Sequence, residues 1–572
     1  MLPPDVSPPP PTGAADSALT RAHWAPVLYA DRPSRLELLK LKPSGAFAPV
    51  TIRVHRNHSF EHIAAATPPW FACWGREPKF LYSDYDDSLS LAFEDAERAD
   101  LELIWLDLQR YAGRFEAAEL PEWLAGRFAA LRARSDAPIV LAAIGVDDAL
   151  QEQLLASARG TAGVRVADFR PLAAKLGARF FDERAAKLSG TRLSDAACVQ
   201  TARELACHWA PGLLLPRIKA VAVDLDNSLY EGVLGEDGHA VRLTPGHEAL
   251  QRHLAGLRER GFFLALISRN EEPDVRGLFE TRTDFPLRWE HFSATAVSWG
   301  HKADGIRAAA ATLRIGTDAM LFVDDNPGEL LAVADALPGV AAVHAMADAA
   351  ATQRVLEFFP GLWSWDRSAA DALRANDLEA ENQRTQLAAQ AVDPMDYLRR
   401  LEVRMRIEVT PRQHLARLHE LSEKTNQFNL NLQRLSEVDL ARLLDAADHR
   451  IAIIGLQDRL SDSGWIGLVV AQRSGDTLTV RELTISCRAL GRKLEDLMVA
   501  EAVRAITSEL PAERVVFLHR TAPRNGPARE WLSRLTGETL PEEGSVFAEE
   551  ALKKVAAADY PVQVDAIHDS AQ

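Results

Sequence analysis

Short apolar runs and amphipathic helical patterns alternate along the first third of the chain. The segments LELIWLDL (101–108), APIVLAAIGV (137–146) and GVRVADF (163–169) have the length and apolar content of buried strands. An amphipathic segment, LPEWLAGRFAALRARS (120–135), is typical of the helices between or beside such strands. The alternation predicts a doubly wound α/β domain, which we place at residues 21–214.

A second α/β unit is predicted for residues 215–365. Its apolar runs KAVAVDLD (219–226), FFLALIS (262–268) and AMLFVDD (319–325) each end in a polar residue. The carboxyl ends of parallel strands face the ligand crevice, so these runs would bring their polar ends to one place.

The rest of the chain predicts a helix and then a third domain. Residues 366–391 are charged, Ala-rich and free of Gly and Pro, which indicates a helical linker at 366–395. Residues 396–572 predict an α+β domain. Its expected elements are helices at about 411–424 and 491–509 and strands at 450–456, 465–472, 477–486 and 514–520. The predicted fold class is therefore multidomain α/β.

Composition narrows the class of protein. The 572 residues are 47% hydrophobic and 26% charged, as in soluble globular proteins. A net charge of -16 argues against nucleic-acid binding, although a local basic patch could still meet an acidic protein. The Pro-rich residues 1–20 predict a disordered tail rather than a signal peptide or membrane anchor. Four cysteines without disulfide or metal spacing favour a cytoplasmic setting.

Two carboxylates close the first strand of the second unit. Asp224 and Asp226 are two residues apart, and such residues in a strand point to the same face. One carboxylate can attack phosphorus while the other protonates the leaving group. Two carboxylates repel a phosphate unless a cation intervenes, and hard oxygen ligands favour Mg²⁺.

The remaining parts of a phosphoryl-transfer site follow in order. Ser268 ends the next strand and could bind a phosphoryl oxygen, and Lys302 could neutralise charge in the transition state. Asp324 and Asp325 supply further carboxylates for the metal. Each residue alone could be an ordinary cap, loop or surface residue. Their succession at strand ends favours a site.

The motif series DxDx(T/S), Ser, Lys and DD resembles that of the haloacid dehalogenase (HAD) superfamily. The longer segments DLDNSLYEGVLGEDG, SRN and FVDDNP resemble its FkbH-like branch. This resemblance implies a nucleophile at Asp224, a general acid/base at Asp226, a phosphate binder at Ser268 and a charge clamp at Lys302. It implies metal ligands at Asp224, Asp226, Asp324 and Asp325, and substrate contacts at Asn227, Ser228, Arg269 and Asn270.

The C-terminal domain resembles the same branch, whose C-terminal domain is similar to GNAT acyltransferases. The segments that carry this resemblance are KTNQFNLNLQRLSEVDL, QDRLSDSGWIGLVV, LTISCRALGRKLEDLMV and RTAPRNGPAREWLSRLTG. Cys487 falls at a predicted strand-to-helix junction, where helix N–H groups and Arg488 would favour the thiolate. A buried structural cysteine is the alternative, and the resemblance implies an acyl-accepting role instead.

Other polar residues of these segments are candidates to line the acyl site or, equally, to be caps and turns. They are Asn426, Gln427, Asn429, Asp458, Arg459, Arg488 and Asn525. In acetyl-CoA users of this fold an R-x-x-G-x-G/A turn cradles the pyrophosphate. Lys493 replaces its last small residue here, which weighs against a conventional CoA site. His519 could act as a general base, but we favour a satisfied core or edge histidine.

The N-terminal domain vaguely resembles the SGNH-hydrolase-like domain of longer FkbH-like proteins. An active SGNH enzyme has GDS after its first strand, whereas Ser59 lies here in the different context VHRNHSFEHI. We therefore expect a structural or docking role.

Together the resemblances imply the substrate 1,3-bisphosphoglycerate and two chemical activities. The glyceryl group would pass to Cys487 and then to the phosphopantetheine thiol of an acyl carrier protein, for polyketide-type assembly, while Asp224 would remove the phosphate ester. Arg488, Arg492 and Lys493 are a candidate basic patch for an acidic carrier. The alternatives are a stand-alone phosphatase, a non-enzymatic scaffold, or another acyl unit such as lactyl.

Overall fold

The computed structural model describes residues 23–43, 47–91, 97–115, 119–184, 186–365, 369–425, 427–490 and 492–568. The tail predicted for residues 1–20 lies outside this part of the chain. Contacts divide the chain into two compact units, Met1–Arg367 and Ser368–Gln572. None of the helices in the described ranges combines the length and apolar content that crossing a bilayer demands.

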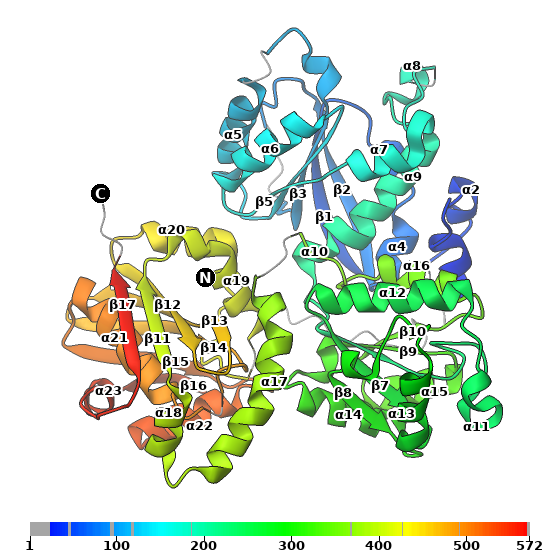
Figure 1. Cartoon of the computed structure of the whole chain (residues 1–572). Helices are drawn as coiled ribbons and strands as arrows, with labels where there is room; N and C mark the ends of the chain where they lie inside the picture. The colour runs from blue at the N-terminus through cyan, green and yellow to red at the C-terminus, as the bar shows by residue number, and fades with distance from the viewer. Residues whose placement is uncertain are drawn as a thin grey trace. The chain divides into compact units, whose positions relative to one another are not determined.

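The first unit begins with a parallel five-stranded sheet in the order β2-β1-β3-β4-β5 (Figure 1). The strands are β1 (Ala48–Arg56), β2 (Arg76–Tyr85), β3 (Leu101–Asp107), β4 (Ile139–Ile144) and β5 (Val164–Val166). Helices α5 (Glu119–Arg132) and α6 (Asp148–Arg159) pack on one face of β3 and β4, and α9 (Asp195–Glu204) packs on the other. The three apolar runs predicted as strands are confirmed as β3, β4 and β5.

The apolar pattern of the sequence did not predict the first strand, β1, because this strand carries buried charged residues. Arg53 Nη1 lies 2.8 Å from Glu102 Oε1, and His55 Nε2 lies 2.9 Å from Glu102 Oε2. The side chain of Glu102 is fully buried. Buried charges persist only when they are paired, so these partners allow a strand with polar residues to lie between β2 and β3 inside the sheet.

A second parallel five-stranded sheet has the order β10-β9-β6-β7-β8. Its strands are β6 (Ala220–Val223), β7 (Phe263–Ser268), β8 (Ala294–Val297), β9 (Met320–Asp324) and β10 (Ala341–His344). The connecting helices are α12 (Pro245–Glu259), α13 (Glu272–Thr281), α14 (Lys302–Thr312) and α15 (Pro327–Ala336). β6 pairs with β7 on one side and β9 on the other, so the polar ends of the three predicted strands are neighbours.

The two sheets of the first unit share one hydrophobic cluster. His208, on the helix that follows α9, stacks on Phe358 and Trp363 with ring centroids 5.1 Å and 5.2 Å away. Its Nε2 also lies 3.0 Å from the carbonyl oxygen of Glu357, which ends α16 (Ala349–Glu357). These contacts join the two sheets within one compact unit.

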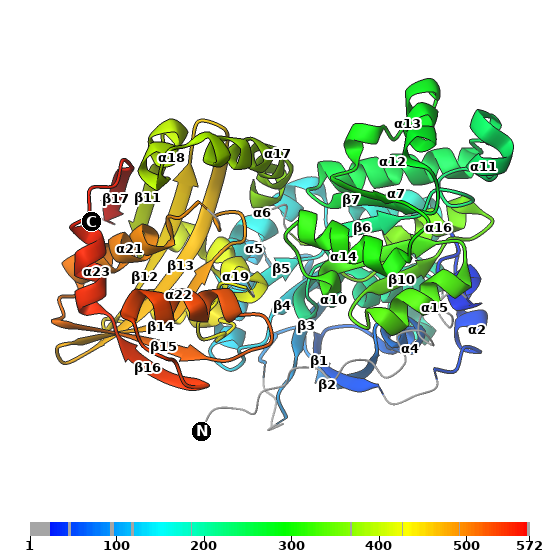
Figure 2. The same ribbon diagram turned by 90° about the horizontal axis from the view of Figure 1, so that it is seen from below.

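The second unit is built on a mixed seven-stranded sheet, ordered β16-β15-β14-β13-β12-β11-β17 (Figure 2). The strands are β11 (Arg404–Val409), β12 (His449–Gln457), β13 (Asp462–Ser474), β14 (Thr477–Ile485), β15 (Arg514–Arg520), β16 (Glu543–Phe547) and β17 (Gln563–His568). α21 (Glu495–Glu509) covers one face, and α19 (Leu415–Lys424) and α20 (Glu437–Asp445) cover the other. The predicted multidomain α/β fold class is confirmed.

The predicted linker helix, α17 (Ala369–Gln390), is fastened to this second unit by buried ion pairs. Arg384 lies 2.9 Å from Asp458 and 3.1 Å from Asp377. Arg492 lies 3.1 Å from Asp377 and 3.3 Å from Asp458. The four side chains are 2% exposed or less, so each charge depends on the others for the solvation that water would otherwise provide.

Replacing Arg384 with Met should weaken the attachment of α17 to the rest of the second unit. Removing one partner leaves buried carboxylates without compensation, which costs about 3–5 kcal/mol. Hydrogen exchange across α17 and β13 in the full chain measures the loss. The matched control is Arg514→Met, because the Arg514–Asp476 pair is half exposed and its loss should leave exchange in α17 and β13 unchanged. Equal effects of the two variants would contradict the proposed importance of the cluster.

Candidate active site

The carboxyl edge of the second sheet gathers the first candidate side chains. Asp224 follows β6, Ser268 ends β7 and Asp324 ends β9. The backbone N–H of Asp224 donates to Val323 O at 2.9 Å, which ties the end of β6 to that of β9. The three residues are 5%, 2% and 0% exposed. The parallel pairing of three strands thus brings together residues that are far apart in the sequence.

Lys302 lies between the two aspartates. It is the first residue of α14, and its Nζ is 3.0 Å from Asp224 Oδ1 and 2.5 Å from Asp324 Oδ2. Burial raises the pKa of Asp224 to about 6, with Lys302 opposing the rise and Asp324 adding to it. Burial alone would lower the pKa of Lys302, but the two carboxylates prevail and raise it. The ammonium group therefore stays charged.

Asp325 adds a third carboxylate to this group. Oxygen atoms of Asp224, Asp324 and Asp325 all lie within 4.8 Å of one another. Burial raises the pKa of Asp325, and the charge of Asp224 raises it further. Three carboxylates against one lysine leave excess negative charge, and an all-oxygen donor set suits a hard divalent cation such as Mg²⁺. These residues could therefore hold a metal ion.

The carboxylate of Asp226 is not among the three that gather here, and its role as a metal ligand stays a prediction. Its Oδ1 accepts hydrogen bonds from the Tyr230 hydroxyl at 2.6 Å and from Leu234 N at 2.9 Å. Its Oδ2 accepts from Asn270 Nδ2 at 2.9 Å, and the same amide donates to Ser268 Oγ at 3.1 Å. Asp226 is thus oriented by three donors, which suits a proton-transfer role better than a ligand role.

Tyr230 is a site residue that sequence reasoning did not single out. Its ring is fully buried, and burial together with the charge of Asp226 raises the pKa of its hydroxyl. The signal was present in the motif, because a tyrosine four residues after Asp226 can reach back across a tight loop. The hydroxyl therefore stays a hydrogen-bond donor to Asp226.

The other predicted substrate contacts of this unit differ in their surroundings. Asn227 is exposed and left-handed (φ 51), and its Oδ1 accepts from Gly232 N at 3.0 Å. Ser228 is buried, and its hydroxyl has no hydrogen-bond partner in the described part of the chain. Arg269 pairs with Glu329 at 2.9 Å. Ser228 is therefore the one of these three whose buried polar atom lacks a partner in the described part of the chain.

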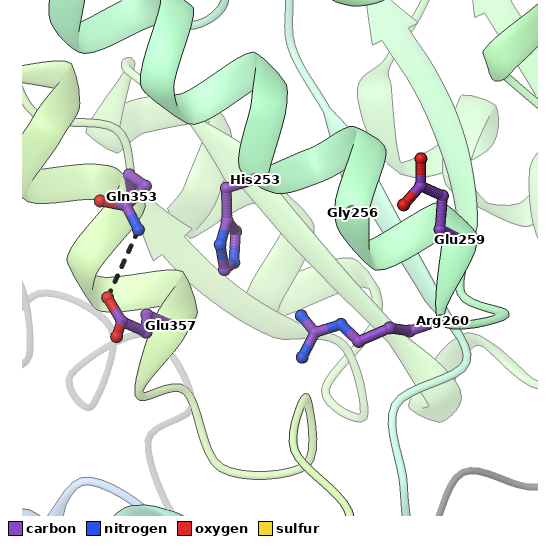
Figure 3. A pocket seen from close by; sticks show the side chains of 6 residues that line it. All are labelled: His253, Gly256, Glu259, Arg260, Gln353 and Glu357. Carbon is purple, nitrogen blue, oxygen red and sulfur yellow. Dashed lines mark hydrogen bonds between the residues drawn. The ribbon is translucent and has the colours of Figure 1, made fainter. Parts of the chain in front are cut away.

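A surface pocket lies elsewhere on the same unit (Figure 3). It is lined by His253, Gly256, Glu259 and Arg260 of the α12 region and by Gln353 and Glu357 of α16. Because α12 ends just before β7 begins, this pocket is at the amino edge of the sheet, opposite the aspartates. It therefore takes no part in chemistry at Asp224.

Cys487 in the second unit is half-buried and lies in a turn after β14. The predicted junction with a helix is wrong, because α21 begins only at Glu495 rather than at residue 491. The helix N-terminus that the sequence placed directly after Cys487 therefore comes later in the chain. Arg492 is fully buried in the ion cluster, so it cannot belong to a surface patch for a carrier protein.

Three predicted acyl-site residues are instead bonded within the fold. Asp458 belongs to the ion cluster. Asn525 Nδ2 donates to the carbonyl oxygens of Asn429 and Arg520 at 3.0 Å and 2.8 Å. Asn429 Nδ2 donates to Glu482 Oε1 at 2.8 Å, and its Oδ1 accepts from Leu432 N at the same distance. The amide N–H groups of both asparagines and the carboxylate of Asp458 are thus engaged by partners within the fold.

The structure describes three of the remaining acyl-site candidates. Gln427 and Arg459 are exposed, and Arg488 is partly buried. Asn426 lies outside the described residues. His519 is buried, and burial lowers its pKa while its Nδ1 lies 3.3 Å from Arg529 Nη1.

Glu482 lies inside β14 and has a buried carboxyl group. The sequence analysis did not identify it, because it falls within a segment that was predicted simply as a strand. It is 1% exposed and accepts from Asn429 Nδ2 at 2.8 Å and from Gln433 N at 3.0 Å. Burial raises its pKa to about 7, although Arg434 and Arg520 act in the opposite direction.

In the N-terminal sheet, Ser59 faces an acid rather than a histidine. Its hydroxyl donates to Glu61 Oε2 at 2.6 Å, while His58 Nδ1 lies 3.1 Å from Thr191 Oγ1. Ser59 and His58 are thus bonded to separate partners, and the structural or docking role of this domain stays a prediction.

Replacing Lys302 with Met should destabilise the first unit and make it depend on a cation. Without Lys302 the buried carboxylates of Asp224 and Asp324 lose their counter-charge, which costs about 3 kcal/mol or more. Millimolar Mg²⁺ should restore more stability to this variant than to the wild type, by binding the folded state. Thermal unfolding with Mg²⁺ or with EDTA measures both effects. Lys175→Met, at an exposed pair with Asp31, is the control.

The second unit should lose stability as Glu482 ionises. The pKa of this group is about 7 in the folded chain against an ordinary value of 4.5, so its protonated form favours folding. That contribution is complete below the ordinary value and is lost as the pH rises through 7, by about 3 kcal/mol. Denaturant unfolding at pH 5 and pH 8 should show this slope in the wild type but not in Glu482→Gln. The exposed Glu543→Gln should keep it.

Comparison with known proteins gives only distant likenesses. The chain matches no family model and no curated protein. A solved structure of the N-terminal part of BF1531 from Bacteroides fragilis, containing a phosphatase domain complexed with Mg, is 18% identical. It covers 59% of this chain and 99% of that one, with a TM-score of 0.43. The spermidine/spermine N-acetyltransferase SpeG from Vibrio cholerae is 11% identical over 27% of this chain and 98% of its own, with a TM-score of 0.19. These likenesses are too distant to support an activity, and the fold rests on the chain's own strand order.

Proposed function

We propose that the first unit is a Mg²⁺-dependent phosphohydrolase whose nucleophile is Asp224. The observation that supports this most is the position of Lys302 between Asp224 and Asp324, with Asp325 beside them at one sheet edge. A phosphoryl group carries negative charge on its oxygens, and such a group needs both a cation and a fixed nucleophile.

The residues divide the chemistry between them. An Asp224 oxygen attacks phosphorus, and the bond from phosphorus to the leaving oxygen breaks. Asp226, oriented by Tyr230 and Asn270, donates a proton to that oxygen and later takes one from the water that hydrolyses the aspartyl phosphate. Ser268 Oγ and Lys302 Nζ stabilise the phosphoryl oxygens. Bound Mg²⁺, held by Asp224, Asp324 and Asp325, would neutralise the remaining charge.

The second unit is proposed to carry the acyl half of the reaction. The thiolate of Cys487 attacks the carbonyl carbon of an acyl phosphate, the C–O bond breaks, and inorganic phosphate leaves. The phosphopantetheine thiolate of an acyl carrier protein then attacks the thioester and frees Cys487. The FkbH-like motifs support 1,3-bisphosphoglycerate as the donor and a glyceryl group as the cargo, in a cytoplasmic pathway of polyketide type.

A stand-alone phosphatase is the second candidate. It is favoured by the position of α21, which begins at Glu495, later in the chain than the helix N-terminus that the sequence placed directly after Cys487. In that case the carboxylate group would act on a small phosphoester and Cys487 would be dispensable.

Intact-mass measurement of a purified carrier protein separates the two candidates. The full chain is incubated with the carrier, Mg²⁺ and 1,3-bisphosphoglycerate generated in place. We expect a glyceryl-sized mass gain on the carrier thiol, which Asp224→Asn and Cys487→Ala both remove. The control Asp335→Asn changes an exposed aspartate of α15 and should load the carrier normally.

Phosphate release is measured in the same reactions. Release without any mass gain, unchanged by Cys487→Ala, would leave only the phosphatase. Full activity of Asp224→Asn would sink the nucleophile assigned here.

A further inference from the structure

Strands β14 and β15 part halfway along their length. They pair in parallel from Thr477 opposite Arg514 to Val480 opposite Phe517, and the ladder ends there. β14 has an irregularity just after this point, opposite Val470 and Ala471 of β13. Beyond it β14 stays on β13 as far as Ile485, while β15 stays on β16. The two strands thus form a fork whose inner edges carry backbone N–H and C=O groups that need partners.

A segment of the same chain fills this fork. We define residues 428–432 as the fork segment. On the β14 side, Leu430 N donates to Leu483 O at 3.1 Å, and Ile485 N donates to Phe428 O at 2.9 Å. On the β15 side, Arg520 N donates to Leu430 O at 3.0 Å. The fork segment therefore lies between β14 and β15, with an antiparallel bridge from Asn429 to Thr484 of β14.

Side chains fasten the fork segment from both strands. Asn525 Nδ2 donates to Asn429 O at 3.0 Å, and Arg520 Nη2 donates to Leu432 O at 2.7 Å. Glu482 of β14 accepts from the Asn429 amide at 2.8 Å. Phe428 and Leu430 are 2% and 1% exposed. Displacing the segment would break all of these bonds and expose both apolar side chains.

The exit of the fork segment also resists a shift of register. Leu432 and Arg434 have positive φ angles of 51° and 54°, which side-chain-bearing residues seldom adopt. Gln433 N between them donates to Glu482 Oε2 at 3.0 Å. The chain thus turns away from the fork through a strained exit that a specific buried acceptor holds.

An open fork would suit an extended ligand with amide groups. Such ligands bind by adding a strand to an unpaired sheet edge, and the pantetheine arm of CoA or of a carrier protein is an extended chain with two amides. Here the chain's own backbone already occupies that edge. Cys487 follows Ile485, the last residue of β14 bonded to the fork segment, so it lies at the open end of the fork, beyond the fork segment.

We propose that the fork segment prevents a pantetheine arm from lying along β14, so that Cys487 takes its acyl group from a small acyl phosphate and not from an acyl-CoA. This rests on the acyl-transfer function proposed above. The carrier then presents only its terminal thiol to Cys487, from outside the sheet. The domain thereby keeps free acyl-CoA from loading the carrier with the wrong acyl unit.

Hydrogen exchange of the full chain tests the proposal directly. Amides of residues 428–432 and 483–485 should be protected, and saturating CoA should leave their exchange unchanged. Asn525→Ala removes three side-chain hydrogen bonds, one of them to Asn429 O of the fork segment, and should speed exchange of the fork segment by about tenfold. Asp476→Asn is the matched control, because Asp476 pairs with Arg514 at the closed end of the same strand pair. It should leave the fork segment protected.

Intact-mass measurement of the enzyme completes the test. Acetyl-CoA should add no mass to the wild-type chain. A CoA-dependent change in exchange at residues 428–432, unprotected amides there in the free protein, or acetylation of Cys487 would each overturn the proposal. If generated 1,3-bisphosphoglycerate also adds no mass at Cys487, the proposed acyl transfer fails, while the exchange result still decides whether the slot is closed to CoA.

Discussion

The candidate active site depends on one buried ammonium group. Lys302 contacts Asp224 and Asp324 at the edge where three parallel strands end, and neither carboxylate could remain ionised there without a cation. Its single charge does not balance the three carboxylates gathered with it. The excess negative charge favours binding of a divalent ion. The carboxylate–lysine cluster that stabilises the fold is therefore also suited to bind a metal ion and a phosphoryl group.

Buried charge also organises the parts of the chain away from this site. Glu102 allows a polar first strand to lie inside the N-terminal sheet, because Arg53 and His55 satisfy it. In the second unit Arg384 and Arg492 bind the same two aspartates and hold α17 against the sheet. Such groups contribute specificity of arrangement, because a shifted register would leave a charge unpaired.

In the second unit, the gap between β14 and β15 is filled by another segment of the same chain. An extended ligand could pair with the inner edges of this fork, but residues 428–432 already form hydrogen bonds with both strands. The asparagines that looked like ligand contacts, Asn429 and Asn525, hold this segment in place. The proposed chemistry of Cys487 must then occur at the outer end of β14, where a small donor and a single thiol can meet.

The sequence by itself predicted the α/β class, most of the strands and the succession of Asp224, Ser268, Lys302 and Asp324. Apolar periodicity and the polar ends of parallel strands are local properties, so residues next to each other in the chain reveal them. It could not reveal the partners of Asp226, the burial of Arg492 or the filled fork. Those features depend on contacts between segments that are distant in the sequence. The sequence alone does not distinguish a polar residue that binds a ligand from one that bonds to a neighbouring strand. Only the tertiary structure decided which of the two it was.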